Sequence, residues 1–110
     1  MDAENKAIAN YFNSLLGRVF KILPLYENLE SRKYLFKYIQ SLLYEFEGLP
    51  DYMNNIKAST DFIIIYSTLE EISNESLFDD DNSDFIKSEI FKCINLIKRI
   101  LKNVGDCNEH

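Results

Sequence analysis

The chain of 110 residues carries 18 acidic and 12 basic side chains, a formal net charge of −6, and 46% of its residues are hydrophobic. This composition excludes a disordered polar chain, and the length indicates one domain. Three glycines and two prolines are too few for the regularly spaced turns of an all-β sandwich. We therefore expect one all-α domain over residues 1–105, followed by a flexible tail over 106–110.

The N-terminal residues are acidic and polar, without the basic and apolar regions of a signal peptide. The longest unbroken apolar run, Phe62 to Tyr66, is far shorter than the roughly 20 residues that span a bilayer. We therefore expect a cytoplasmic chain that does not insert into membranes. Cys93 and Cys107 lack the spacing of a zinc site or a disulfide framework, and Cys93 lies on an apolar stripe that predicts burial.

The first predicted helix covers residues 3–23, and Pro24 is expected to end it because proline disfavours the helical conformation of the preceding residue. Gly17, inside this helix, either marks a close helix crossing or is simply tolerated. Apolar side chains recur in steps of three and four, as on one face of an α-helix. These are Ile8, Phe12, Leu15, Val19 and Leu23.

The second predicted helix covers residues 29–47. Gly48 is expected to follow it in the left-handed conformation, with Pro50 shortly after. A third helix ends at 74 and begins either at 51, directly after Pro50, or at 60, with Ser59 or Thr60 as its N-cap. Residues 62–66 have the composition of a strand, but no second run of this kind exists to pair with them, so a helix is favoured.

The fourth predicted helix covers residues 84–104, with Gly105 as its C-terminal stop. Its basic end, Lys98, Arg99 and Lys102, complements the helix dipole. Four helices of this length, joined by short connections, predict an antiparallel four-helix bundle.

The charge is unevenly distributed along the chain. Residues 45–84 contain eleven acidic side chains and one basic side chain, Lys57. We expect this segment to form an acidic surface that repels nucleic acid and attracts a protein with a basic surface. The alternative is that these residues only maintain solubility and cap the last helix. The candidate partner-binding residues are Glu70, Glu71, Glu75, Asp79, Asp80 and Asp81.

The second helix contains more aromatic side chains than one core-facing stripe can bury. Tyr34, Tyr38 and Tyr44 are therefore candidate contacts with a partner protein or with a second copy in a homodimer. The alternative is a thick core from which the tyrosine hydroxyl groups reach the surface.

We find no arrangement of residues that indicates catalysis. The only histidine is the last residue, His110, and the three glycines stand apart from one another. The acidic loop over 78–84 resembles a calcium loop, but Asp84 and Ile90 occupy the positions that require glycine and a bidentate glutamate. We therefore expect no enzyme, no metal and no cofactor.

The sequence thus predicts a small, non-catalytic, acidic protein that acts by binding another protein. In size and helix content it is similar to helical-bundle immunity proteins and to small phage and plasmid inhibitors and antitoxins, although no motif is shared. A stoichiometric inhibitor of this kind is the leading expectation. The alternatives are a structural or assembly subunit that forms homo-oligomers and a regulator associated with nucleic acid.

Overall fold

A computed structural model of the chain describes residues 2–78 and 81–106. These ranges contain helices and connections but no strand, so the all-α prediction is confirmed. None of the described helices combines the length and the apolar character needed to cross a membrane. The elements are α1 (Ala3–Phe20), α2 (Ile22–Glu27), α3 (Leu29–Glu47), the 3-10 turn η1 (Asp51–Met53), α4 (Asn54–Lys57), α5 (Thr60–Glu75) and α6 (Ser83–Asp106).

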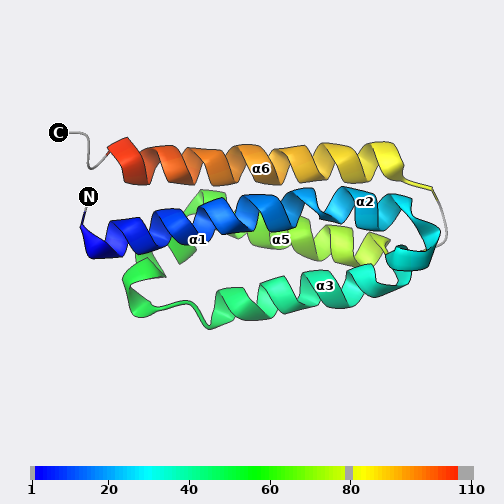
Figure 1. Ribbon diagram of the computed structural model, residues 1–110, viewed down its shortest axis with the longest axis horizontal. Helices are drawn as coiled ribbons and strands as arrows, with labels where there is room; N and C mark the ends of the chain where they lie inside the picture. The colour runs from blue at the N-terminus through cyan, green and yellow to red at the C-terminus, as the bar shows by residue number, and fades with distance from the viewer. Residues whose placement is uncertain (1, 79–80, 107–110) are drawn as a thin grey trace.

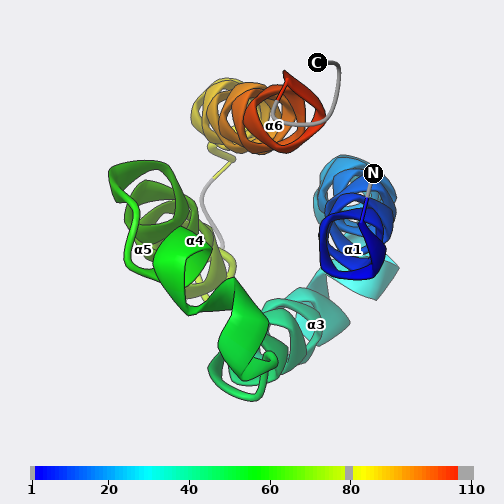
Figure 2. The same ribbon diagram turned by 90° about the vertical axis from the view of Figure 1, so that its left-hand side faces the viewer.

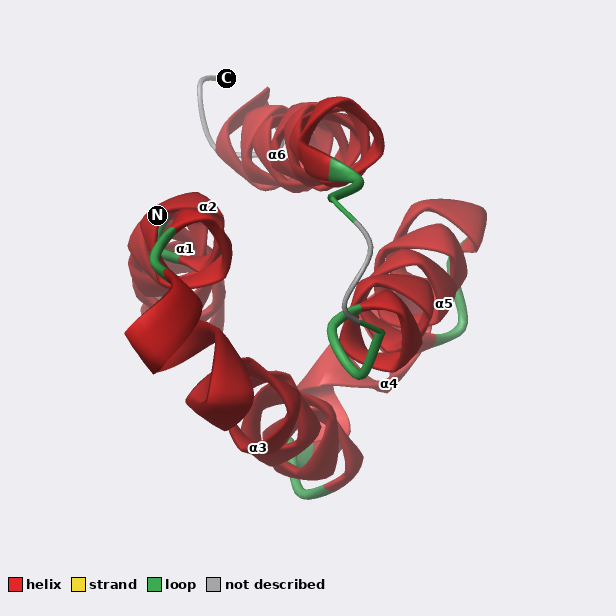
Figure 3. Ribbon diagram, turned by 90° about the vertical axis from the view of Figure 1, so that its right-hand side faces the viewer, coloured by secondary structure: helices red, strands yellow, loops and turns green. Residues whose placement is uncertain are grey.

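The long helices run along the long axis of a molecule that measures 49 × 24 × 21 Å, and successive long helices run in opposite directions (Figure 1). Viewed along that axis, α1 with α2, α3, α5 and α6 surround a shared interior (Figures 2 and 3). α3 packs between α2 and α5, while α6 packs between α5 and α1. The outer sides of α3 and α5 therefore lie on the opposite side of the molecule from the line where α1 meets α6.

The interior is built from the apolar stripes of all the long helices. Phe12, Phe46 and Phe62 pack together within it, with ring centroids 6.3 Å apart for Phe12 and Phe62 and 5.1 Å apart for Phe46 and Phe62. Cys93 is fully buried, as its place on the apolar stripe of α6 predicts. The core thus joins α1, α3 and α5 through one aromatic cluster.

Proline does not end the first helix where we expected it to. α1 ends at Phe20, and after Lys21 the chain re-enters a helix, α2, with Pro24 in its first turn. A first-turn residue has no intrahelical acceptor for its N–H, so proline is tolerated there. Gly17 does not mark a crossing, because a Cβ atom at this position would meet nothing within 4 Å.

Two other predicted helix ends differ from the structure. Gly48 caps α3 with φ −97°, so it does not adopt the expected left-handed conformation. α6 continues through Gly105 to Asp106, and the rest of the predicted tail, 107–110, lies outside the described residues. Of the two proposed starts of the third helix, the later one is confirmed: α5 begins at Thr60 with Ser59 as its N-cap, whereas the residues after Pro50 form the separate short turns η1 and α4.

Candidate interaction surface

The predicted acidic residues do not form one continuous surface. Glu70 and Glu71 are exposed on α5, whereas the half-buried Glu75 accepts a hydrogen bond of 2.8 Å from the side chain of Asn82. Asp81 accepts hydrogen bonds from the Ser83 hydroxyl and backbone N–H, which lower the pKa of its carboxyl. Glu75 and Asp81 therefore hold the connection into α6. The remaining two candidates, Asp79 and Asp80, lie outside the described residues.

The three candidate tyrosines occupy different environments. The half-buried Tyr38 donates a hydrogen bond of 2.7 Å to the backbone carbonyl of Arg18, and burial raises the pKa of its phenol. Tyr34 is 60% exposed and Tyr44 is 79% exposed, so both present their rings to solvent. The thick-core interpretation therefore fits Tyr38, while Tyr34 and Tyr44 remain available to a partner.

Tyr38 belongs to a polar cluster between α1 and α3 that sequence analysis missed. Arg18 forms a two-pronged ion pair with Glu45, with N–O distances of 2.6 and 3.3 Å, and its guanidinium carbon lies 5.7 Å from the ring centroid of Tyr11. Because Arg18 lies 27 residues from Glu45, no local pattern connects them. The cluster fixes the side of α3 that faces α1 and takes no part in the contact between α3 and α5.

The polar cluster predicts a loss of stability at alkaline pH. Burial, and then the nearby Glu45 carboxylate, raise the pKa of Tyr11 from 10.0 to about 12. The folded state therefore holds this proton more tightly than the unfolded state, and the resulting stability is present below pH 10 and lost as the pH rises toward 12. We expect Tyr11→Phe to flatten the fall of unfolding free energy over this interval. Urea denaturation at several pH values measures it, and equal slopes in both proteins would contradict the assignment.

A hollow of about 500 Å³ lies where the surface of α3 meets α5. Tyr44 and Tyr66 lie on its two sides, and Glu47 lines it near them. The pKa of the Tyr66 phenol is raised by partial burial and then by the negative charges of Glu47 and Glu70. We call Tyr44, Glu47, Tyr66 and Glu70 the acidic end of the α3–α5 seam.

A second hollow, of about 580 Å³, lies further along the same pair of helices. Its lining includes Lys33 together with exposed apolar side chains, of which Leu29 is 75% exposed. Arg32 also lines it, but its guanidinium stacks on the Tyr26 ring at 4.0 Å. We call Leu29, Lys33, Phe36, Leu77 and Phe78, with the neighbouring exposed Lys37, the basic end of the seam.

The two ends of the seam are separated by a contact between the helices. The side-chain amide of Gln40 on α3 donates a hydrogen bond of 3.0 Å to the hydroxyl of Ser73 on α5. The hollow with Tyr44, Tyr66 and Glu47 therefore lies toward one side of this bridge, and the hollow with Lys33 and apolar side chains toward the other. Lys57 lines the space beyond Glu47, at the far limit of the acidic end.

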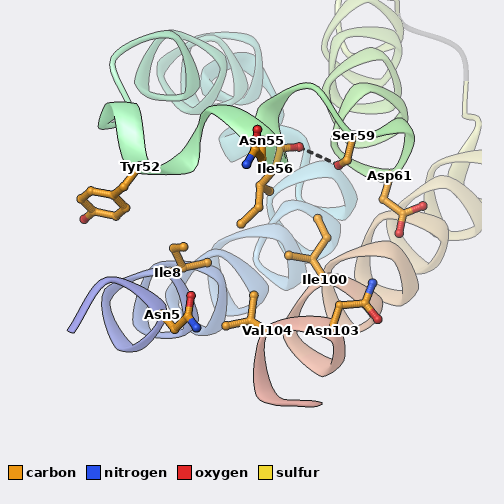
Figure 4. Close-up of a pocket in the computed structure, with 10 residues that line it drawn as sticks. All are labelled: Asn5, Ile8, Tyr52, Asn55, Ile56, Ser59, Asp61, Ile100, Asn103 and Val104. Carbon is orange, nitrogen blue, oxygen red and sulfur yellow. Dashed lines mark hydrogen bonds between the residues drawn. The ribbon is translucent and has the colours of Figure 1, made fainter. Parts of the chain in front are cut away.

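A third hollow, of about 410 Å³, opens at the end of the molecule that holds the N-terminus of α1 and the C-terminus of α6 (Figure 4). Apolar side chains gather in it, and asparagines stand around them. Asp61, the charged residue among the described residues that line it, is already paired with Arg99 through contacts of 2.9 and 2.8 Å. Arg99, one of the three basic residues near the C-terminal end of α6, therefore has a partner within the chain.

Comparisons with protein-family models, with curated proteins and with solved structures find no match to this chain.

Proposed function

We propose that this chain is a non-catalytic protein-binding domain whose binding surface is the α3–α5 seam. The observation that carries the proposal is the acidic end, where Tyr44 is 79% exposed beside Glu47 and Tyr66. Exposed tyrosine rings supply a large apolar contact area with a polar tip, and they are enriched at protein interfaces. An exposed aromatic side chain in a lined hollow is therefore a candidate anchor for a partner.

The charge of the acidic end indicates which partner group fits it. A lysine or arginine side chain entering the hollow meets the carboxylate of Glu47 and the side chains of Tyr44 and Tyr66, and the charge of Glu70 on α5 adds to the negative potential there. Cations are attracted both to carboxylates and to the faces of tyrosine rings. A basic side chain on the partner thus complements both the negative charge and the aromatic rings of the hollow, in line with the basic partner expected from the sequence.

In its most concrete form the domain is a stoichiometric inhibitor, immunity protein or antitoxin that occupies a basic surface of its target. We propose an antiparallel four-helix bundle as its fold. The ion pair between Arg18 and Glu45 holds α3 against α1 in this bundle and does not cover the seam. A structural or assembly subunit is the second candidate, and the opposite charges at the two ends of the seam favour it.

Photo-crosslinking inside the source cells tests this function. Tyr44 is replaced by a benzophenone amino acid, and the matched control carries the same group at Phe91, an exposed aromatic residue on α6. We expect position 44 to give one reproducible covalent adduct, which is lost when Glu47→Lys and Glu70→Lys are added. Phe91 should not give that adduct, because it lies beside Phe20 of α1 on the opposite side of the molecule.

The same experiment can overturn the proposal. If position 44 gives no adduct, or if its adduct is unchanged by both charge reversals, the acidic end is not a binding surface. Adducts formed only from position 91 would instead indicate an interface along the line where α1 meets α6.

A further inference from the structure

We infer that the partner of the α3–α5 seam is a second copy of this chain, bound with the two α3 helices antiparallel. This inference rests on the proposed function, because it uses the same seam. It adds the identity of the partner, the two-fold arrangement and the residues that face one another.

α3 presents opposite charges at its two ends. Lys33 and Lys37 are exposed in its N-terminal half, and Glu47 is exposed in its last turn. Of the other charged residues near these positions, Arg32 lies on Tyr26 and Glu45 is paired with Arg18, while Glu30 in the first turn is exposed. The exposed charges of α3 are therefore net positive in its N-terminal half, where two lysines outnumber one glutamate, and negative in its last turn.

A two-fold axis converts this polarity into self-complementarity. Suppose that two α3 helices cross antiparallel, with the two-fold axis passing between Gln40 and Ser41. A residue on one side of the two-fold axis then lies level with the residue of the second copy whose number is equally far from the crossing point on the other side. Lys37 then faces the second copy's Tyr44, which offers its exposed ring to the ammonium group. Lys33, whose ammonium lies 5.1 Å from the ring centroid of Tyr34, lies on the same side of the helix as Glu47 and faces the second copy's Glu47. Each contact occurs twice, because such an interface is isologous.

The residue at the crossing suits a close approach. Ser41 is exposed and small, and its hydroxyl already donates a hydrogen bond of 2.7 Å to the backbone carbonyl of Tyr38. Covering it therefore leaves no hydroxyl donor without an acceptor. Helices can approach closely where small side chains lie at the contact, with axes roughly 8–10 Å apart. The exposed rings of Tyr34 and Tyr44 are then covered on either side of the axis.

A different protein with a basic surface would complement a smaller part of the seam than a second copy of this chain does. Such a partner uses only the acidic end and leaves the exposed apolar side chains of the basic end, Leu29, Leu77 and Phe78, uncovered. A second copy brings an acidic end to a basic end on both sides of the axis. Charge complementarity along the whole seam therefore favours the second copy.

Sedimentation equilibrium of the purified full-length chain, from micromolar to millimolar concentration, tests the inference. We expect a reversible monomer–dimer equilibrium in the wild type. The variant Lys33→Glu/Lys37→Glu and the variant Glu47→Lys/Glu70→Lys should each dimerise at least tenfold more weakly, since both place like charges together twice per dimer. Mixed in equal amounts, they should form a heterodimer, because each altered end then faces an end of opposite charge.

Matched variants separate a specific interface from a general effect of charge. Lys87→Glu/Lys98→Glu changes the net charge equally at exposed positions on α6 and should dimerise as the wild type does. In a chain carrying Cys107→Ser, mild oxidation should join two copies through Ser41→Cys near the axis. Ser88→Cys, exposed on α6, should not form this link.

The outcomes distinguish this inference from the proposed function. A wild-type chain that stays monomeric up to millimolar concentration overturns the homodimer, and so does a dimer that both reversals leave unchanged. In either case, an adduct from position 44 to a different protein would still support the seam as a binding surface. If neither dimer nor adduct forms, both proposals are wrong.

Discussion

Replacing Phe46 with alanine is expected to lower the free energy of unfolding by about 3–5 kcal/mol, which is the usual cost of removing a fully buried aromatic ring. Phe46 is 1% exposed, and its ring centroid lies 5.1 Å from that of Phe62 and 6.2 Å from that of Tyr66. The substitution leaves a cavity where α3 and α5 meet. Because small domains are stable by only about 5–15 kcal/mol, this loss is a large part of the total free energy of unfolding.

Two further variants show whether burial is the cause. Phe46→Leu keeps most of the volume and should cost about 1 kcal/mol. Tyr44→Ala removes an aromatic ring from the same helix, but that ring is 79% exposed, so the change should stay within about 0.5 kcal/mol. Urea denaturation of the three variants, at a concentration where the chain is monomeric, measures these differences. Equal losses for Phe46→Ala and Tyr44→Ala would contradict the assignment of the core.

Sequence analysis predicted α3 well because its signals are local. The apolar stripe carries helical periodicity over its full length, and Gly48 with Pro50 marks its end, so the bounds 29–47 agree with the structure. The break between α1 and α2 was harder to place, because Pro24 removes a helical hydrogen bond one turn before its own position. The Pro24 nitrogen cannot donate to the carbonyl of Phe20, and α1 ends at that residue.

The binding surface was only partly predictable, because neighbouring helices decide which side chains remain exposed. Tyr34, Tyr38 and Tyr44 look alike in sequence, and only the position of the Arg18 carbonyl on α1 selects Tyr38 for an internal hydrogen bond. Glu70 and Glu75 likewise look alike, yet Asn82 binds Glu75. The segment rich in acidic residues was visible in the sequence, but its separation into capping and exposed residues depends on tertiary contacts.

Replacing Tyr26 with alanine is the second change with a large expected effect, again about 3–5 kcal/mol of unfolding free energy. The side chain is fully buried between α2, α3 and the start of α6. Its hydroxyl accepts a hydrogen bond of 2.9 Å from the backbone N–H of Asn82, 56 residues away, and the guanidinium of Arg32 lies 4.0 Å above its ring. The substitution therefore removes core volume, a cation–π contact and the anchor of the connection into α6.

Tyr26→Phe separates these contributions, because it keeps the ring and the Arg32 contact but removes the hydroxyl. We expect it to cost about 1 kcal/mol, the net value of one hydrogen bond, and to speed hydrogen exchange at the Asn82 amide. Tyr34→Phe is the matched control, since its ring is 60% exposed, and it should leave both measurements unchanged. If Tyr26→Phe leaves the Asn82 amide as protected as in the wild type, the hydroxyl does not hold this connection, and the large effect of Tyr26→Ala comes from packing alone.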